Sequence, residues 1–525
     1  MSLSEAPRVS RWQSTIMALS IFVIFSLICS RTLSSPYLVM DDVGIYEYGS
    51  HPSFVGGQGR IIEFYLNNTL FHGRMDLYYP IRYALFLLCY LWVGLLTESI
   101  WVETKKPLAT LSAMALFMAS VPFIVFESWA TLGIHVLAYI LVSLTWRMIR
   151  DRLSVLRFSM ASALIVLSLH IYQVALFFIL APCFASILSQ GFLIRRHGGQ
   201  LMRCGLVSVT GAILYVLTLK GFLSSQGIPA SDRLGRSAEL LQGEALIQRL
   251  AGIKPYFSAY LYPEQSVLSL SIVASAALAS ALALAAFQGV RHPLNRGKLS
   301  FFLGIITVTG IFAATLIPPL LGGGGTFLRE DLPLTLLLTI SLSFFVFELA
   351  ARTFRPIRFA LISLIALGSI HTGMANMKGY IYPYQLEQAF IRAGIEKAHQ
   401  NRCPRVAFVA PKLGPHDHCC DITQPTLGHE PSIKLTSEYA EWNQGALGMY
   451  HFAIEMLEGP LSDSLKKPLY LGRKSEQGRR DFVAQGVCQV IDMSRLERIF
   501  SEWARSPEIK LPSLGDISNI YQEDL

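Results

Sequence analysis

Residues 154–189 read SVLRFSMASALIVLSLHIYQVALFFILAPCFASILS, an apolar run of 36 residues. A single helix needs only about 20 apolar residues to cross the hydrocarbon core of a bilayer, so this run is too long for one span. The segment HIYQ, residues 170–173, places polar side chains near its middle. We therefore predict two membrane-spanning helices that meet at a tight corner formed by HIYQ.

The composition of the whole chain is typical of a membrane protein. Of its 525 residues, 52% are hydrophobic and only 15% charged, and the mean hydropathy is +0.44. Nine further apolar segments have the length of a span, near residues 14–34, 78–97, 107–126, 128–146, 203–221, 265–289, 299–319, 332–350 and 357–375. No small-residue cleavage site follows the first of them, which we interpret as a retained span rather than a signal peptide. The chain is thus predicted to be an α-helical polytopic membrane protein with about eleven transmembrane helices.

The lysines and arginines of the connecting loops predict the orientation, because cytoplasmic loops of membrane proteins are enriched in them. If the N-terminus, with Arg8 and Arg11, is cytoplasmic, every second connection is basic. These connections contain Lys105 and Lys106, RMIRDR (147–152), RRHGGQLMR (195–203), RHPLNRGK (291–298) and RTFRPIR (352–358). Because topology explains the net charge of +8, we expect no nucleic-acid partner.

The alternate connections and the C-terminal region are predicted on the opposite, extracytoplasmic side. Residues 1–376 form the expected transmembrane domain, which includes extracytoplasmic loops 35–77 and 220–264. Residues 377–525 are polar, with charges and turn residues throughout, and form the expected extracytoplasmic C-terminal domain.

This C-terminal domain is predicted to be small and of the α/β class. RVAFVAP (405–411) predicts a short buried strand, and residues 437–459 have helical spacing that ends at a glycine. Four cysteines lie in the domain, Cys403, Cys419, Cys420 and Cys488, and His416 and His418 lie close to the adjacent pair Cys419 and Cys420. No CxxC spacing supports a zinc site, so disulfides or free thiols are favoured over a metal.

Two adjacent carboxylates, Asp41 and Asp42, lie where the first apolar segment gives way to its extracytoplasmic loop. The loop continues through GGQGR to the amphipathic segment IIEFYLNNTLF (61–71), whose pattern is typical of a helix on a membrane surface. Adjacent carboxylates repel each other, so one pKa tends to rise, and such tuning suits a general base. A solvated surface pair is the alternative interpretation.

Other polar residues are predicted at the same face, at the edges of spans, where polar side chains are costly and therefore are functional candidates. As candidates for substrate binding we take Arg60, Glu63, Glu127, His170, Tyr172, Gln173 and Arg329. Arg60 and Arg329 suit a phosphate, because a guanidinium forms bidentate contacts. An alternative explanation for the polar residues of HIYQ is that a corner between two helices itself requires some polar side chains. Since the chain has no P-loop, no GxGxxG after a strand and no HExxH motif, we expect no nucleotide cofactor and no metal.

Taken together, these features resemble a known family. A polytopic chain with an acidic pair in its first extracytoplasmic loop resembles the GT-C class of glycosyltransferases. The arrangement MDD…GQGRIIEF, with LSLHIYQ (167–173) and TFLRED (326–331), is similar to the serotype-converting glucosyl transferases that modify O-antigen. The resemblance covers about residues 10–375.

The resemblance implies an enzyme of the bacterial inner membrane that acts on its outer, periplasmic face. Such an enzyme transfers a sugar, here expected to be glucose, from a polyprenyl-phosphate donor to a polysaccharide such as O-antigen in lipopolysaccharide, by one inverting displacement. Asp41 would be the general base, Asp42 would hold the acceptor or orient Asp41, and Arg60 or Arg329 would neutralise the leaving phosphate. The implied partners are the lipid bilayer, the lipid-linked sugar, the polysaccharide acceptor, a flippase and a donor synthase.

Two other functions remain as alternatives. A flippase or transporter of lipid-linked sugar is expected to have internal repeats and broken helices at the membrane midplane, and the chain shows no clear repeat. An O-antigen polymerase or ligase is expected to carry Arg and His in a large extracytoplasmic loop late in the chain, which loop 220–264 matches only in part.

Overall fold

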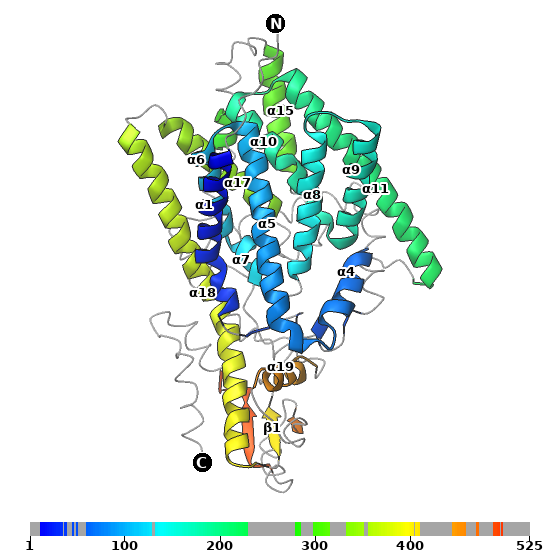
Figure 1. Ribbon diagram of the computed structural model, residues 1–525, viewed down its shortest axis with the longest axis vertical. Coiled ribbons are helices and arrows are strands. Elements are labelled where there is room, and N and C mark those ends of the chain that lie inside the picture. Colours follow the sequence, from blue (N-terminus) through cyan, green and yellow to red (C-terminus); the bar gives the residue numbers. More distant parts are fainter. Residues whose placement is uncertain are drawn as a thin grey trace, which may run out of the picture.

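The computed structural model shows a mostly helical protein in which a bundle of helices is followed by a small sheet (Figure 1). It describes residues 11–34, 36–38, 42, 45–46, 49–50, 59–128, 132–228, 279–284, 298–315, 332–350, 355–403, 405–409, 444–457, 469–471, 487–493 and 495–496.

Most helices of the bundle run along one common direction (Figure 1), whereas α7 is bent by 66° from α6. The described helices of the bundle are α1 (Arg11–Cys29), α5 (Tyr78–Thr104), α6 (Pro107–Ala119), α7 (Val121–Ser128), α8 (His135–Ile149), α9 (Val155–Ile171), α10 (Ala181–Gln190), α11 (Gly199–Gln226), α15 (Lys298–Thr315), α17 (Leu332–Ala350) and α18 (Arg355–Gln400). Short helical pieces connect them: η1 (Ser30–Leu33), α4 (Ile61–Leu66), η2 (Asn67–Phe71), η3 (Met75–Leu77), η4 (Leu132–Ile134), η5 (Gln173–Leu180) and η6 (Ile194–Gly198).

Among the described residues, five helical stretches are long and apolar enough to cross a membrane. They are Trp12–Leu33, Met75–Thr104, Gln173–Gln190, Arg196–Gln226 and Leu332–Ala350, and the bent pair α6 and α7 adds a sixth if it is counted as one span. The fold is therefore that of an α-helical membrane protein. The predicted number of eleven spans stays a prediction, because α8, α9 and α15 are apolar but shorter and most of 265–289 lies outside the described residues.

The long apolar run 154–189 divides at the predicted place. Helix α9 ends at Ile171, and Tyr172 has an extended backbone with φ −157° and ψ 113°. A new helical stretch then begins at Gln173 as the 3₁₀ segment η5 and continues into α10. The extended residue interrupts the helical hydrogen bonds, so the two halves form separate helices.

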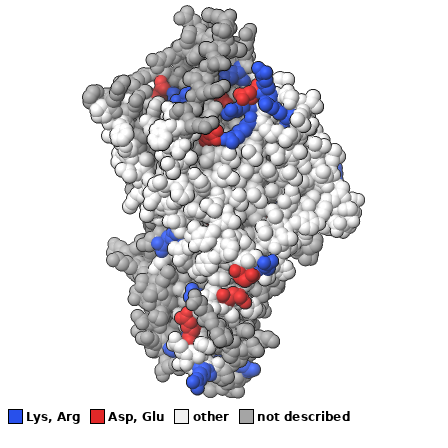
Figure 2. Space-filling model, viewed as in Figure 1, with Lys and Arg blue, Asp and Glu red and all other residues white. Residues whose placement is uncertain are grey.

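The surface of the bundle matches a lipid environment. Figure 2 shows a band without charged side chains across the middle of one face, with Lys, Arg, Asp and Glu gathered above and below it. Large apolar side chains are exposed along α1 and α11, among them Trp12, Leu19, Met202, Val209 and Leu217. Soluble monomers rarely expose apolar surface on this scale, so we assign these faces to the bilayer.

The described C-terminal region contains a parallel three-stranded sheet with the order β2 (Leu469–Leu471), β1 (Val406–Val409), β3 (Gln489–Asp492). Helix α19 (Gln444–Glu455) lies on the connection from β1 to β2, as a parallel pairing requires a crossover. The strand predicted at 405–411 and the helix predicted at 437–459 thus coincide with β1 and α19. In Figure 1 this unit lies beyond the end of the bundle opposite the start of α1.

Helix α18 differs from the expected arrangement of a span at 357–375 followed by a separate domain. It continues without a break over 46 residues, so the expected boundary at residue 377 falls inside it. Such a helix is roughly 70 Å long, more than the hydrocarbon thickness, and its second half leaves the bundle to reach the sheet (Figure 1). On that half many described side chains are buried, among them Met377, Ile381, the five consecutive residues 384–388, Ile391, Ile395 and Ala398. The second half of α18 is therefore packed against the rest of the protein and is not a solvated extension.

A disulfide joins Cys403, directly after α18, to Cys488, directly before β3. It closes a loop across 85 positions of the sequence and ties the end of the long helix to the sheet. The preference for a disulfide over zinc is therefore confirmed for this pair. Cys419, Cys420, His416 and His418 lie outside the described residues.

Candidate functional site

Asp42 is the member of the acidic pair that the structure describes, and it is almost fully buried, with 1% of its surface exposed. Its charge interacts with Tyr37, Tyr46, Tyr78 and Arg82. Burial of a carboxylate is costly unless nearby groups compensate for the lost water. Asp42 is thus not a solvated surface acid, whereas its neighbour Asp41 lies outside the described residues.

Tyr78, at the start of α5, holds the chain just ahead of the acidic pair. Its hydroxyl donates to the carbonyl oxygen of Tyr37 at 2.7 Å, and the backbone N–H of Tyr37 donates to the same hydroxyl at 3.3 Å. The ring of Phe452 on α19 packs against Tyr78 with 5.0 Å between centroids. Segment 36–38 is thereby tied to α5, and Tyr78 also contacts the C-terminal unit.

The hydroxyl groups of Tyr37 and Tyr46 stay neutral at pH 7. Burial, the largest cause, raises the pKa of both well above the ordinary value for tyrosine, and the charge of Asp42 acts in the same direction. The Tyr37 hydroxyl can therefore donate, and it does so to the carbonyl oxygen of Ser128 at 2.9 Å.

Arg82, one turn into α5, is a buried cation close to Asp42. Its Nη2 donates to the Tyr37 hydroxyl and, at 2.6 Å, to the carbonyl oxygen of Ser128, while Nη1 approaches the carbonyl oxygen of Glu127 at 3.5 Å. The guanidinium also lies over the Tyr37 ring, 4.9 Å from its centroid. One side chain thus connects α5, the end of α7 and the segment before the acidic pair. We call Tyr37, Tyr78, Arg82 and Glu127 the Arg82 cluster.

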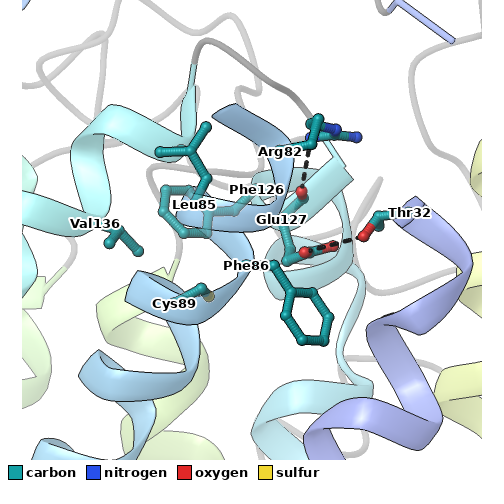
Figure 3. Close-up of a pocket in the computed structure, with 9 residues that line it drawn as sticks. Thr32, Arg82, Leu85, Phe86, Cys89, Phe126, Glu127 and Val136 are labelled. Carbon is teal, nitrogen blue, oxygen red and sulfur yellow. Dashed lines mark hydrogen bonds between the residues drawn. The ribbon is translucent and has the colours of Figure 1, made fainter. Parts of the chain in front are cut away.

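Glu127 is buried near the end of α7, and one carboxylate oxygen accepts a hydrogen bond from Thr32 at 3.3 Å. It lines a small cavity whose polar side chains gather on one side, while Cys89 and Val136 lie on the other (Figure 3). The complete lining is Thr32, Arg82, Leu85, Phe86, Cys89, Phe126, Glu127, Gly133 and Val136. The cavity leaves about 10 Å³ for the centres of water molecules, which is room for about one water and too little for a sugar ring.

A second polar group forms around Arg60, at the start of the short helix α4. Arg60 Nη1 pairs with Glu63 Oε2 at 3.2 Å, and His135 Nε2 lies 2.9 Å from the other carboxylate oxygen of Glu63. All three side chains are at least nine-tenths buried. The amphipathic segment therefore turns a carboxylate into the bundle, where it joins α4 to α8.

Tyr172 and Gln173, from the corner between α9 and η5, complete this group, which we call the Arg60 network. Arg60 Nε donates to Gln173 Oε1 at 3.1 Å, and the guanidinium lies 4.7 Å from the centroid of the Tyr172 ring. The ring of His135 stacks on Tyr172 at 4.0 Å and 5°. The corner predicted from HIYQ thus supplies side chains to a site besides ending a helix.

Tyr215 of α11 extends the network to His170. Its hydroxyl accepts from Gln173 Nε2 at 3.0 Å and donates to the carbonyl oxygen of Gly59 at 3.1 Å. Gly59 has φ +71°, and a Cβ there would stand 2.3 Å from the Tyr215 hydroxyl, so this close approach requires glycine. His170 contacts the Tyr215 ring and lies 2.7 Å from Thr218 Oγ1.

The structure thus brings most predicted candidates together at one end of the bundle. Arg60, Glu63, Tyr172 and Gln173 are in contact, His170 joins them through Tyr215, and Glu127 belongs to the Arg82 cluster with Asp42 nearby. Arg329 lies outside the described residues. The buried carboxylates can accept protons, the neighbouring cations can bind an anion, and the neutral tyrosines can hydrogen-bond to hydroxyl groups.

Sequence reasoning missed Arg82 and His135. Arg82 is the one charged residue of the span predicted at 78–97, and His135 is the one histidine of the span predicted at 128–146. A charged or titratable side chain inside an apolar run is a functional candidate on those grounds alone, so the signal was present in the sequence.

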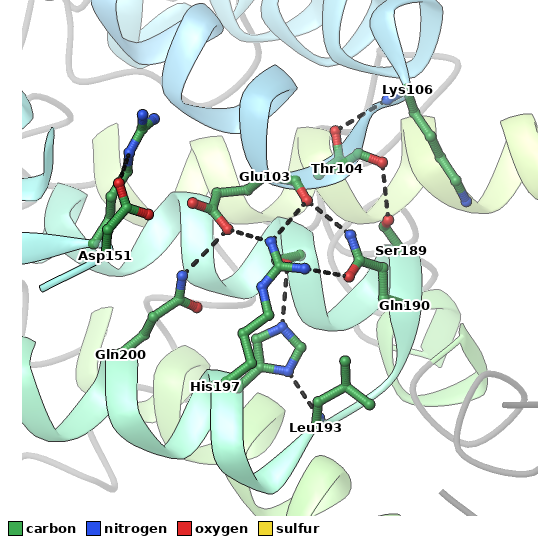
Figure 4. Close-up of polar contacts among 12 residues, drawn as sticks. Glu103, Thr104, Lys106, Asp151, Ser189, Gln190, Leu193, His197 and Gln200 are labelled. Atoms are coloured by element: carbon green, nitrogen blue, oxygen red, sulfur yellow. Dashed lines mark hydrogen bonds and ion pairs between the residues drawn. The ribbon is translucent and has the colours of Figure 1, made fainter. Parts of the chain in front are cut away.

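A different polar network lies near the C-terminal end of α5 (Figure 4). Glu103 pairs with Arg196 at 2.8 Å and accepts from Gln200 at 3.2 Å, and its backbone oxygen accepts from Gln190 at 2.8 Å. The adjacent His197 accepts from the Leu193 N–H at Nδ1 and contacts Ser186 Oγ through Nε2 at 3.0 Å. We call Glu103, Gln190, Arg196 and Gln200 the Glu103 network. It connects the ends of α5, α10 and α11.

No cluster of three or more metal-binding side chains occurs within the described ranges. Comparison of the chain with protein-family models, curated proteins and solved structures finds no match.

Proposed function

We propose that this protein is an integral-membrane glycosyltransferase. It transfers a sugar, expected to be glucose, from a polyprenyl-phosphate donor to a cell-surface polysaccharide such as O-antigen. The observation that carries the proposal is the burial of Asp42 at the end of a membrane bundle, within electrostatic reach of Arg82. A donor held in the bilayer and an acceptor held in water can meet only at such a boundary.

In the proposed reaction the acceptor hydroxyl attacks the anomeric carbon of the donor sugar while Asp41 takes its proton. The bond from the anomeric carbon to the phosphate oxygen breaks, and polyprenyl phosphate leaves with the bonding electrons. A single displacement inverts the anomeric centre. Asp42 holds the acceptor or orients Asp41. A positioned base contributes about 10²–10⁴-fold to the rate of such a reaction.

The proposal assigns the leaving phosphate to Arg60 or Arg329. Arg60 already pairs with Glu63 and Gln173, so a phosphate there would take over one of these contacts. Tyr172, Gln173 and His170 are the proposed partners of sugar hydroxyl groups. Glu127 can contact a sugar only if its cavity opens, since that cavity has room for about one water.

We place the site on the outer face of the bacterial inner membrane, with the N-terminus in the cytoplasm. The basic connections predicted as cytoplasmic include Arg196 and Arg203, which hydrogen-bond to the ends of neighbouring helices away from Asp42. The disulfide between Cys403 and Cys488 suits an oxidising compartment such as the periplasm. A donor synthase and a flippase would then supply the lipid-linked sugar.

The test is a transfer assay with the purified full chain in liposomes. Polyprenyl-phosphate glucose and an O-antigen acceptor are supplied on the same side, and the product is analysed by mass spectrometry and NMR. We expect a glycosylated acceptor with inverted anomeric configuration and one polyprenyl phosphate released per transfer. Absence of product with a series of donor sugars and acceptors would contradict the proposal.

The same liposomes separate the enzyme from a transporter. With labelled donor in the inner leaflet and no acceptor, a flippase moves the label to the outer leaflet, whereas a glycosyltransferase leaves it in place. Movement of the intact donor without product formation would therefore favour the transporter.

A further inference from the structure

Arg82 and Glu127 are buried charged residues for which the proposed transfer has no direct use. Charges in the apolar part of a membrane protein are costly and are retained where they serve a function. Arg82 extends between α5, Ser128 and Tyr37, and its charge interacts with those of Glu127 and Asp42. The pair therefore lies between the bundle and the chain that carries the acidic pair.

Tyr37 is held at three points. Its carbonyl oxygen and its N–H both contact the Tyr78 hydroxyl, at 2.7 and 3.3 Å, and its own hydroxyl accepts from Arg82 and donates to the carbonyl oxygen of Ser128. Asp41 follows only four residues later, which spans at most roughly 14 Å of extended chain. The position of Tyr37 thus limits where the acidic pair can lie.

Arg82 and Glu127 each have a buried polar atom that lacks a hydrogen-bond partner among the described side chains. Arg82 Nε and Glu127 Oε2 are buried and have no hydrogen-bond partner among the described residues. Both side chains line the same cavity, which has room for about one water molecule. A water there would accept from Arg82 and donate to Glu127, which satisfies both atoms at once.

We propose that Arg82 and Glu127, joined by one water molecule, form a buried anchor that holds Tyr37 and thereby positions Asp41 and Asp42. Arg82 is then a positioning residue, and Glu127 holds the water that completes its hydrogen bonds. The catalytic consequence rests on the proposed function, whereas the anchor itself can be measured without any transfer.

The central variant replaces both charges at once, as Arg82→Met with Glu127→Gln. Removal of one side chain leaves a buried polar group of the other without its water-mediated contact, so each single variant is expected to unfold at a lower temperature than the double variant. Tyr83→Phe is the matched control, because Tyr83 follows Arg82 on α5 but has a half-exposed side chain.

Hydrogen–deuterium exchange of the Tyr37 amide provides the direct readout. In the double variant we expect this exchange to rise about tenfold, since the hydrogen bond from Arg82 to the Tyr37 side chain is lost. Exchange in α8, residues 135–149, is expected to stay unchanged, and Tyr83→Phe is expected to match the unmodified protein. Unchanged exchange at Tyr37 in a folded double variant would overturn the anchor.

If the double variant does not fold, Tyr37→Phe tests the same contact, because it removes only the hydroxyl. We expect faster Tyr37 exchange there too, and exchange equal to that of the unmodified protein would again overturn the anchor.

Kinetic measurements of sugar transfer test whether the anchor affects catalysis. We expect the double variant to lose at least about tenfold in kcat with little change in KM for the donor, because a misplaced base slows the chemical step. Faster Tyr37 exchange with full kcat would refute positioning. Absence of transfer by the unmodified protein would refute the proposed function instead, and the exchange experiment would still decide the anchor.

Discussion

Glu103 and Glu127 are both buried carboxylates of the helical bundle, yet their surroundings differ. Glu103 pairs with Arg196 at 2.8 Å and accepts from Gln200 at 3.2 Å. Glu127 accepts from Thr32 through one oxygen, and its other oxygen has no hydrogen-bond partner in the described part of the chain. The Glu103 carboxylate thus has a charged partner, although Oε1 of Gln200 in the same network is buried without a hydrogen-bond partner among the described residues. An ion pair holds helices in place, whereas a buried carboxylate oxygen without a partner leaves a group for water or a ligand. The Glu103 network therefore lies at an end of the bundle with a structural role, whereas Glu127 lies at the end where we propose the sugar transfer.

The largest effect on stability is expected from Glu63→Gln in the Arg60 network. The change removes the carboxylate that contacts both Arg60 and His135, and it leaves a buried guanidinium without its ion pair. Loss of one partner of a buried pair costs about 3–5 kcal/mol. Thermal unfolding in detergent measures the loss. Glu98→Gln, which breaks the exposed pair with Arg147, serves as the control and is expected to cost about 0–1 kcal/mol. Equal shifts in the unfolding temperature of Glu63→Gln and Glu98→Gln would refute a buried, stabilising ion pair between Glu63 and Arg60.

The next effect concerns the disulfide that ties α18 to the sheet. Replacement of Cys403 and Cys488 by serine frees a loop of 85 positions, and we expect a loss of about 2–4 kcal/mol in the stability of the C-terminal unit. Limited proteolysis after Gln400 measures this loss, while cleavage within the membrane helices is expected to stay unchanged. Identical digestion patterns would contradict a stabilising role for the disulfide.

Glu103→Gln tests the structural end of the bundle and is expected to cost about 1–3 kcal/mol. The cost is smaller than for Glu63 because the Arg196 side chain is 40% exposed and water can solvate it once the pair is lost. Transfer per folded molecule is expected to stay within about twofold of the unmodified protein. A large loss of transfer by Glu103→Gln at unchanged stability would contradict a purely structural role for the Glu103 network.

Ser186→Ala is expected to have the smallest effect, about 1 kcal/mol. The Leu193 N–H donates to Nδ1 of His197, so in neutral His197 the proton lies on Nε2 and points to Ser186. His197 therefore donates to the serine and does not activate it as a nucleophile. Ser189→Ala, which removes a 3.3 Å contact to Thr104, is a comparable control. Loss of activity in Ser186→Ala alone would show that this contact has a chemical role.

Much of the fold could be predicted from apolar runs and loop charges. The division of 154–189 at HIYQ is confirmed, because Tyr172 adopts an extended backbone there and ends α9. The span predicted at 107–126 is instead divided into α6 and α7, which are bent by 66°. The bend lies next to Pro122, a signal in the sequence that the prediction did not use. The continuation of α18 past residue 377 was missed, because the polar composition from residue 377 onward was interpreted as the start of a separate domain.

The residues of the candidate site could be predicted from the sequence better than the contacts between them. Arg60, Glu63, Tyr172 and Gln173 were candidates because of their residue types at the edges of spans, and they are in contact. The pairing of Glu63 with His135 could not be predicted, because it depends on how α4 docks against α8, 72 positions further along the chain. Contacts of this kind arise from helix packing and leave no local pattern in the sequence.

The most direct test of the central claim compares Asp41→Asn and Asp42→Asn with Asp76→Asn in the transfer assay. Asp76 is the matched control, since it lies at the same end of the bundle in an exposed pair with Arg74. We expect a loss of about 10²–10⁴-fold in kcat for Asp41→Asn and a loss of at least about tenfold for Asp42→Asn, with full transfer by Asp76→Asn. Full transfer by both Asp41→Asn and Asp42→Asn would contradict the account.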